Sequence, residues 1–451
     1  MKIVVIGDGK VGRAIVEHTC QEGHEVVVID TNPSVVEELV NQYDVMGICG
    51  NGASYEIQSN ASVDKADLVV AATSSDETNV LSCMIAKNLG AKSTVARIRS
   101  YEYNKQINQM KRDFGITMTI NPEKEASLEI MKILNFPEAI RVDTFAKGNV
   151  DLVELYIPEN SPLIGQSLAS IHQKYQVKVL VCAVQRNEDV FIPTGNFTFQ
   201  AKDKIHITAR RLMVKQFLNK LGLIESKIKN VLIIGGGKIA VYLGEYLLKS
   251  KYQVKIIEKD YDRCLELSQL LPNATIIHGN ASDQRVLDEE GLTNNDAIVC
   301  LTGIDEENII ISMYAYKQNV HKIVAKINKT SLIGLIDSIN MVSTIAPKEI
   351  TASRIVSYIR ATNNSRGSNI ITLYKLVNNK VEALEFKASE KSKVLSIPFK
   401  NLKVKKNVLI AGIIREGDVI IPSGDDMIQA GDNVIVITTN QRLDDLDDIR
   451  E

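Results

Sequence analysis

Short runs of aliphatic residues alternate with helical patterns along the first 120 residues. The apolar runs cover residues 3–6, 26–29, 45–49, 68–72, 94–98 and 116–120. Between them, apolar residues recur every three or four positions, which is the spacing of an amphipathic helix. Strands buried on both faces and separated by helices are typical of a doubly wound parallel sheet. We therefore predict an α/β fold for this part of the chain.

The pattern changes after a final helix. Pro122 is expected in the first turn of a helix that runs to about Leu134, with Ala126, Ile130 and Leu134 along one stripe. Beyond residue 140, short strands with hairpin signals replace the alternation and end in the strand pattern KIHIT. This composition predicts a small α+β domain.

The whole arrangement occurs twice. The stretch from Lys229 to Asp260 repeats the opening unit, and later pairs such as Asp76 with Asp305 recur at an offset of 229 residues. The second helix begins at Pro347, and the second hairpin region (IPSG) matches the first (IPTG). We predict two tandem copies of a Rossmann-like domain followed by a small α+β domain, with a hinge between the copies around residues 222–229. The predicted domains are 1–138, 139–224, 228–362 and 366–451.

The first thirty residues have the order that a dinucleotide site requires: strand, glycine turn, helix, strand, acid. Gly7, Gly9 and Gly12 follow the first strand in the spacing G-x-G-x-x-G, and Asp30 ends the second strand. The first glycine permits a tight turn, the second lets a pyrophosphate approach the backbone, and the third lets the helix pack closely. Asp30 can accept hydrogen bonds from ribose hydroxyls. In the second copy, Ala240 takes the third glycine position.

Other polar residues follow the strands at the carboxyl edge of each sheet, where ligands bind in this fold. Asp76 is a candidate for ligand contact or for helix capping, and Asn51 for the adenine side or a structural turn. Arg97 could reach phosphate, bridge to a neighbouring subunit, or lie in solvent, and Lys10 could add a charge for a terminal phosphate. The full set of candidate nucleotide-binding residues is Gly7, Asp8, Gly9, Lys10, Val11, Gly12, Asp30, Thr31, Asn51, Thr73, Asp76, Asn79 and Arg97, with Gly235, Gly236, Gly237, Lys238, Ile239, Ala240, Glu258, Lys259, Asn280, Thr302, Asp305, Asn308 and Lys326 in the second copy.

Composition limits the classes of partner and the cellular location that the protein can have. The chain has 451 residues and a formal net charge of −2 that is spread along it, so no basic patch suggests nucleic acid binding. No apolar run approaches the roughly 18–20 residues needed to span a bilayer, and no signal segment precedes the first strand. We therefore expect a cytoplasmic protein. The six cysteines show no C-x-x-C spacing and are expected as buried reduced thiols, and no metal site is readable.

The segments GDGKVG, VVVID, GNGAS, TSSDETN and ARIR, followed by a hairpin-rich domain, resemble the TrkA family of potassium-uptake proteins. The resemblance covers essentially the whole chain and implies two RCK units, each with a Rossmann-like N-domain and a C-domain. It also implies a non-enzymatic regulator that binds NAD or NADH, with ATP or ADP as further candidates. Such a protein forms a homotetrameric ring, gates a potassium-translocating membrane subunit, and lies on the inner face of the cell membrane through that partner.

The resemblance also assigns a role to the helix that starts at Pro122. It would be the crossover helix that locks adjacent N-domains, and we expect Ile130 and Leu134 on it to face a partner subunit. Lys326 stands where the family usually has arginine, which leaves open whether the two sites bind equally.

An NAD-dependent oxidoreductase with a duplicated cofactor domain is the alternative. Tyr101 and Lys105 have the spacing of a short-chain dehydrogenase pair. However, no serine lies about a dozen residues upstream, and the second copy offers no tyrosine at the matching position. Because a dehydrogenase needs a group for proton transfer, the sequence favours nucleotide binding without turnover.

Overall fold

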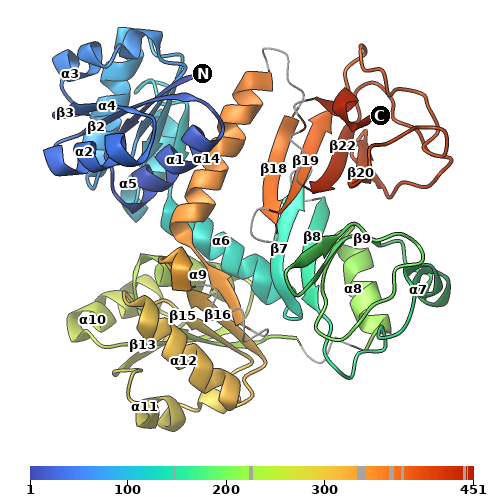
Figure 1. The fold of residues 1–451 in the computed structure, drawn as a ribbon. Coiled ribbons are helices and arrows are strands. Elements are labelled where there is room, and N and C mark those ends of the chain that lie inside the picture. Colours follow the sequence, from blue (N-terminus) through green and yellow to red (C-terminus); the bar gives the residue numbers. More distant parts are fainter. Residues whose placement is uncertain are drawn as a thin grey trace.

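The computed structural model describes residues 1–145, 149–222, 227–332, 342–364, 370–376, 380–439, 443 and 445–451. Within them the chain forms two parallel six-stranded sheets and two antiparallel five-stranded sheets. Figure 1 shows the two parallel-sheet domains on the left and the two antiparallel domains on the right. The predicted fold class is confirmed. Residues 223–226 of the predicted hinge, and the predicted domain start at 366, lie outside the described residues.

The first N-domain has the strand order β3-β2-β1-β4-β5-β6. Its β-branched strands are buried on both faces, and Val4 and Val5 of β1 are fully inaccessible. The reversal of strand order beside β1 places the glycine turn at the carboxyl edge of the sheet. The strands are β1 Lys2–Ile6, β2 Glu25–Asp30, β3 Met46–Cys49, β4 Leu68–Ala71, β5 Ser93–Arg97 and β6 Met118–Ile120; the helices are α1 Lys10–Gln21, α2 Pro33–Gln42, α3 Tyr55–Asn60, η1 Val63–Lys65, α4 Asp76–Leu89, α5 Tyr101–Met110 and α6 Pro122–Asn135.

The second N-domain repeats this plan with the order β14-β13-β12-β15-β16-β17. Its strands are β12 Asn230–Ile234, β13 Gln253–Glu258, β14 Thr275–His278, β15 Ala297–Cys300, β16 Lys322–Lys326 and β17 Val342–Ile345; its helices are α9 Lys238–Lys249, α10 Tyr261–Leu270, α11 Gln284–Glu289, η3 Leu292–Asn294, α12 Asp305–Lys317, η4 Thr330–Leu332 and α14 Pro347–Asn364. The internal duplication inferred from sequence is therefore structural as well.

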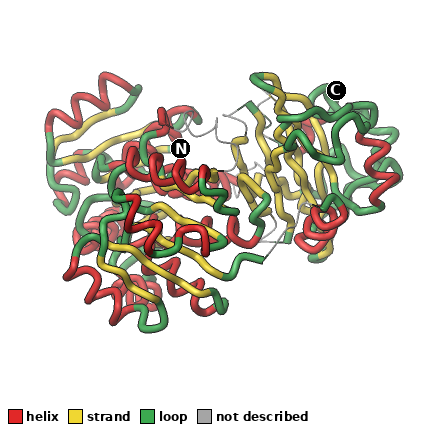
Figure 2. Tube along the Cα trace, turned by 90° about the horizontal axis from the view of Figure 1, so that it is seen from below, coloured by secondary structure: helices red, strands yellow, loops and turns green. Residues whose placement is uncertain are grey.

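The two C-domains pack against each other through their sheets, whose orders are β10-β9-β11-β8-β7 and β18-β19-β22-β20-β21. Leu152 and Ala183 of one sheet form a buried cluster with Ala383 and Ile437 of the other. Figure 2 shows these strands gathered at one end of the molecule. The elements are β7 Ala139–Phe145, β8 Val150–Tyr156, α7 Leu168–Tyr175, β9 Leu180–Arg186, β10 Asp189–Phe191, β11 Lys204–Ala209 and α8 Arg211–Lys220, then β18 Ile370–Leu376, β19 Val381–Lys387, β20 Val408–Arg415, β21 Asp418–Ile420, β22 Asn433–Thr439 and η5 Leu446–Ile449. The hairpins β9–β10 and β20–β21 confirm the predicted ones.

The last helix of each N-domain crosses to the other N-domain. Ile130 and Leu134 of α6 are buried in one cluster with Leu243 of α9. Reciprocally, Ile355 of α14 is buried with Ile15 of α1. Figure 1 shows α14 (orange) beside α1 and α6 (cyan) reaching the second N-domain.

The expectation that Ile130 and Leu134 face a partner subunit is wrong. They face the second N-domain of the same chain, because the duplication supplies the complementary surface internally. The expectation of buried thiols also needs a correction. All six cysteines are free, but Cys49 at the end of β3 is exposed and Cys20 is only half-buried.

Candidate functional site

Each glycine turn has the geometry that its sequence demands. Gly7 has φ +93°, and a Cβ there would lie 2.8 Å from the backbone nitrogen of Thr73. A Cβ at Gly12 would lie 2.0 Å from the carbonyl oxygen of Gly7, so the close approach of α1 to β1 requires glycine. Gly235 repeats the turn with φ +94°. Val11 and Ile239 are buried, and Ala240 is accommodated in the core of the second N-domain.

The helices that follow the turns present free N-termini. Gly9 caps α1 and Gly237 caps α9, and neither cap makes a side-chain hydrogen bond. Neither helix has an acidic residue in its first turn. The first N–H groups and the positive end of each helix dipole are therefore available to an anion. Lys10 and Lys238, the first helical residues, are both exposed.

The acids at the ends of β2 and β13 hold the turns in place. The Asp30 carboxylate accepts hydrogen bonds from the backbone N–H of Asp8 at 2.8 Å and of Asn32 at 2.9 Å. The Glu258 carboxylate accepts equivalent bonds from Gly236 at 2.6 Å and Asp260 at 2.9 Å. Each carboxylate lies beside its glycine turn, where the ribose of a dinucleotide is held in this fold. The next residues, Thr31 and Lys259, are exposed.

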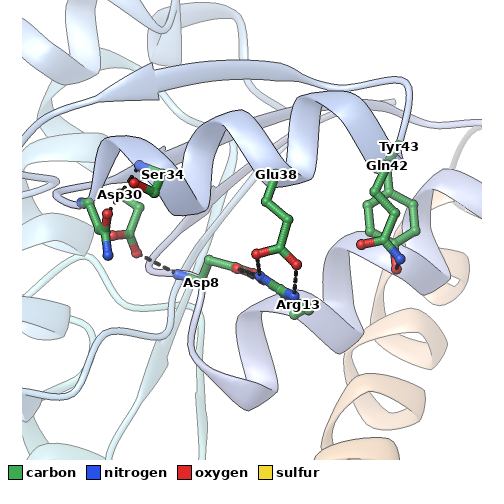
Figure 3. Close-up of polar contacts among 8 residues, drawn as sticks. Asp8, Arg13, Asp30, Ser34, Glu38, Gln42 and Tyr43 are labelled. Atoms are coloured by element: carbon green, nitrogen blue, oxygen red, sulfur yellow. Dashed lines mark hydrogen bonds and ion pairs between the residues drawn. The ribbon is translucent and has the colours of Figure 1, made fainter.

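An arginine that sequence reasoning missed lies over the first turn. Arg13 of α1 donates to Asp8 at 2.9 Å and to Glu38 of α2 at 2.7 Å, and Figure 3 shows this bridge beside Asp30. Burial raises the pKa of the Asp8 carboxyl above its ordinary value, and the bond from Arg13 opposes that shift. In the second copy the arginine comes from α10 instead, where Arg263 donates to the Gly236 carbonyl at 2.8 Å. The two arginines occupy different positions in the two copies, so the sequence repeat does not identify them.

The side-chain amides of Asn79 and Asn308 form hydrogen bonds to other groups of the protein. The Asn79 oxygen accepts from the backbone N–H and hydroxyl of Thr73, and its nitrogen donates to the Arg97 carbonyl at 2.9 Å. Asn308 makes the matching bonds to the Thr302 N–H and the Lys326 carbonyl. Both asparagines are fully buried. They join the carboxyl ends of two neighbouring strands and thereby shape the sheet edge.

Asp76 and Asp305 also bind backbone. The Asp76 carboxylate accepts from the N–H groups of Arg99 at 2.9 Å and Ser100 at 2.7 Å, in the loop after β5. Asp305 binds the equivalent loop after β16 through the N–H groups of residues 328 and 329. Asp76 is not the helix cap, because Ser75 caps α4. The sequence left ligand contact and capping open, and the structure shows a third role, which is to fix the loop that carries Arg99.

Asn51 and Asn280 form turns. The side chain of Asn51 accepts from the N–H of Ala53 at 2.9 Å, and that of Asn280 from Ser282 at 3.1 Å. Both residues are exposed after the third strand of their sheet. This is the structural turn that the sequence analysis named as the alternative to a role on the adenine side.

The cations at the ends of β5 and β16 are not solvated surface groups. Arg97 is only 8% exposed, and its Nε has no hydrogen-bond partner among the residues that the structure describes. Burial, and then the neighbouring Arg99, lower the pKa of Arg97. Burial likewise lowers the pKa of Lys326, and the charges of Asp305 and Glu123 oppose this shift while that of Lys10 in the first N-domain adds to it.

Lys326 borders a pocket of about 200 Å³ that both N-domains line. Gly237, Lys238 and Lys326 come from the second N-domain, whereas Arg99 and Glu123 come from the first. Arg99 Nε donates to Glu123 Oε1 at 2.7 Å, and Glu123 Oε2 is buried without a partner among the described residues. Ligand pockets commonly enclose about 300–1,000 Å³, so this one fits a phosphate group rather than a whole nucleotide. Sequence reasoning missed Arg99 and Glu123 as site residues.

Tyr101 contacts the second N-domain as well. Its hydroxyl donates to Glu245 of α9 at 3.2 Å, and its ring lies 5.6 Å from that of Tyr242. Asn121, the cap of α6, donates to the Tyr242 hydroxyl at 3.0 Å. The side chain of Lys105, the other half of the dehydrogenase-like pair, lies outside the described residues. These contacts place Tyr101 in the junction between the N-domains.

Comparison with known proteins agrees with this architecture. Residues 3–122 and 231–347 match the TrkA-N domain, and residues 152–222 and 383–450 match the TrkA-C domain. The chain belongs to the TrkA family. One relative is the Trk system potassium uptake protein TrkA of Halomonas elongata, which is 29% identical over 448 residues, covering 98% of this chain and 96% of that protein. The family resemblance drawn from the sequence is therefore confirmed.

Solved structures show the same fold. The GsuK channel bound to NAD superposes with a TM-score of 0.62 at 14% identity, over 97% of this chain and 77% of that one. GsuK bound to ADP superposes with a TM-score of 0.52 at 13% identity, over 81% and 69% of the two chains. Within the described residues, no helix is long and apolar enough to cross a membrane.

Proposed function

We propose that this TrkA-family protein is a cytoplasmic regulatory subunit that binds nicotinamide and adenine nucleotides and gates a potassium-translocating membrane subunit. The observation that carries the proposal is the pocket between the N-domains. Its walls come from both domains. Arg99 of the first domain and Lys238 and Lys326 of the second line it beside the second phosphate turn, and the charge of Lys10 in the first domain acts on Lys326. An anion bound at such a junction contacts both domains at once, so binding changes how they fit together.

The residues present fit a nucleotide. The free N-termini of α1 and α9 would receive the phosphates, and Asp30 or Glu258 would hold the ribose hydroxyls. The buried Nε of Arg97 lacks a partner among the described residues, and an anionic oxygen would satisfy it. A bound NAD would supply two phosphates and two riboses for these groups. The binding of NAD and of ADP by GsuK chains of the same fold supports this assignment.

Several proposed site residues act by positioning others. Asn79 and Asn308 hold the strand ends that carry Arg97 and Lys326, and Asp76 holds the loop that carries Arg99. Nucleotide phosphates draw Arg99 of the first N-domain toward the glycine turn of the second, because opposite charges attract strongly in a partly dry site. The crossover helices α6 and α14 then transmit the closure, since each is packed into the core of the opposite domain. Gating requires only that the open and closed forms differ in nucleotide affinity.

A homotetramer is part of the proposal. The helix α12 leaves an apolar stripe exposed, formed by Ile310, Met313 and Tyr316, which are 66%, 51% and 46% accessible. Residues three positions apart lie on one face of a helix, and apolar faces of this kind mark protein contacts. We propose that a second copy of the chain covers this stripe, so that the N-domains join into a ring beneath the membrane subunit.

Potassium flux tests the function directly. The Trk-type membrane subunit is reconstituted in vesicles, and flux is measured with and without this protein across NADH, NAD, ATP and ADP. We expect flux to depend on the protein and to change with at least one nucleotide. Flux that is independent of both the protein and the nucleotides would contradict the regulatory function and reopen the oxidoreductase alternative. Steady-state redox assays with varied small substrates would then test that alternative.

A further inference from the structure

A polar groove lies at one end of the second parallel sheet. It encloses about 760 Å³, which is within the size range of small-ligand sites. The first residues of β12, β13 and β14 line it: Asn230, Gln253 and Thr275. The glycine turn that starts at Gly235 follows the opposite end of β12. The groove is therefore separate from the proposed nucleotide site.

The equivalent place in the first N-domain is closed by apolar side chains. There, Val27, Ala61 and Ala66 are at most 1% exposed and belong to one apolar cluster. The sequence repeat pairs these positions with three polar residues, all of which line the groove: Lys255, Glu290 and Asn295. The second copy has thus lost an apolar contact and gained a polar cavity at the same place.

Lys255 and Glu290 form an ion pair in the groove. The Lys255 Nζ donates to the backbone carbonyl oxygen of Glu290 at 2.7 Å and to its carboxylate at 3.2 Å. Their side chains are 30% and 32% exposed. Apolar residues of similar volume commonly stabilise a fold at least as well as a partly buried ion pair does, so stability does not explain the exchange. Polar residues that interrupt a core without such a gain are typical of functional sites.

The other polar side chains of the groove are free to bind a ligand. Lys251 has no ion-pair partner among the described residues. The neighbouring acid Asp296 is already used, because its carboxylate accepts the backbone N–H groups of residues 229 and 230 at 2.7 and 2.8 Å. Four amide side chains line the groove and make no hydrogen bond to another described residue: Asn230, Gln253, Asn273 and Asn294.

The charges of the groove define a complementary ligand. The ammonium groups of Lys251 and Lys255 and the carboxylate of Glu290 line it together. A molecule with two carboxylates and one ammonium group matches all three, and side-chain amides can donate to the former and accept from the latter. We propose that the groove binds an acidic amino acid such as glutamate. Its carboxylates bind the two lysines, and its ammonium group binds Glu290.

The groove also contacts the crossover helix α6. The hydroxyl of Tyr252, which lines the groove, lies 3.5 Å from Oδ1 of Asn135, the last residue of α6. A bound amino acid therefore contacts a side chain that packs against the connection between the N-domains. None of the groove residues belongs to the nucleotide site, so the inference does not depend on the proposed function.

Calorimetric titration of the full-length protein with L-glutamate tests the proposal, with potassium chloride of equal ionic strength as the blank. We expect one saturable site per chain. Glutarate, which lacks the ammonium group, and γ-aminobutyrate, which lacks one carboxylate, should each bind about tenfold more weakly or less, because each loses a charge-assisted contact. Equal binding of glutamate and glutarate would overturn the assigned ligand class.

Two variants separate recognition from damage to the fold. Glu290→Gln should weaken glutamate binding about tenfold or more without weakening glutarate binding, a change of preference that misfolding cannot produce. The double variant Lys255→Val with Glu290→Ala installs the residues of the first copy, and it should lose glutamate binding while keeping the wild-type melting temperature or exceeding it. Lys317→Met, an exposed lysine of α12, is the control and should bind glutamate like the wild type. Absence of saturable binding by the wild type, or an affinity that neither groove variant changes, would overturn the inference.

Discussion

The side chain of Lys322 donates a hydrogen bond to the backbone carbonyl oxygen of Ala139, and the two residues belong to different domains. Lys322 begins β16 of the second N-domain, and Ala139 begins β7 of the first C-domain. Lys322 is 3% exposed, and Glu138 and His321 lie beside it with one buried side-chain atom each unpartnered among the described residues. Lys215 also acts on Glu138 through its charge. A lysine is thus buried at the joint between the two domains.

This arrangement predicts a pH dependence. Burial lowers the pKa of Lys322 from 10.5 to about 7, and the charge of Glu138 opposes the shift. Between pH 7 and 10.5 the unfolded chain therefore binds a proton that the folded chain does not. The free energy of unfolding should then rise with pH across this window, by at most about 4–5 kcal/mol at about 1.36 kcal/mol per unit.

Urea unfolding of wild type and Lys322→Met between pH 7 and 9 measures the effect. The variant should be the more stable at pH 7, and its advantage should shrink as the pH rises. Lys317→Met, which removes an exposed lysine of α12, is the matched control and should leave the slope unchanged. Parallel curves for the wild type and Lys322→Met would contradict the prediction.

Arg99→Gln should weaken nucleotide binding at the second N-domain although the residue lies in the first. It lines the pocket beside Gly237, and loss of a charged contact to phosphate should lower affinity about tenfold or more. Titration calorimetry of Arg99→Gln beside Glu258→Ala identifies the affected site, because Glu258 belongs to the second N-domain. Arg112→Gln, an exposed arginine of the same domain, is the control. If Arg99→Gln weakened only the site that Asp30 serves, the shared pocket would be wrongly assigned.

Asp30→Asn should weaken the first site by about tenfold, because a charged ribose contact becomes neutral. It should also lower the melting temperature slightly, since Asp30 accepts two backbone hydrogen bonds from the turns on either side. The exposed Asp44→Asn serves as the control. A fall in melting temperature with no loss of affinity would assign Asp30 a purely structural role.

Ile130→Ala should lower the free energy of unfolding by about 2–5 kcal/mol, because the side chain is fully buried against α9. Leu128→Ala on the exposed side of the same helix should cost far less. Light scattering should give the same oligomeric mass for both variants. Dissociation of the oligomer by Ile130→Ala would mean that α6 contacts another chain after all.

Met313→Glu should dissociate the proposed ring into single chains, because it places a charge in the middle of the exposed stripe on α12. Leu212→Glu, at an equally exposed apolar position on α8, should leave the mass unchanged. Both masses are measured by light scattering at micromolar concentration. An unaltered mass for Met313→Glu would place the assembly surface elsewhere.

The fold could be predicted well from the sequence because the features that specify it are local in the chain. Strands such as Ile3–Ile6 are continuous apolar runs, and Gly7 and Gly12 are required by a turn and a close contact within one βαβ unit. Repetition of the pattern then extends the same reasoning to the second half. Each of these features depends on neighbours in the chain or on the period of one element.

The site was only partly predictable because its remaining residues depend on tertiary contacts. Asn79 was nominated as a nucleotide ligand, yet its amide is used by Thr73 and the Arg97 carbonyl, which lies 18 residues away. Arg99 and Glu123 reach the pocket only because α6 crosses to the other N-domain. No residue spacing in the sequence indicates that α6 packs against the other N-domain of the same chain. For the same reason, Ile130 was expected to face another subunit.

The exchange of α6 and α14 has a consequence for how the molecule comes apart. Because each N-domain has a helix of the other in its core, neither half can unfold while its neighbour stays intact, and the pair should melt in a single cooperative transition. The covalent link also fixes the local concentration of one half around the other, so dilution cannot separate them. A chain cleaved between residues 222 and 227 loses this link and is held together only by the exchanged helices, so its two halves should separate on strong dilution whereas the intact chain should not.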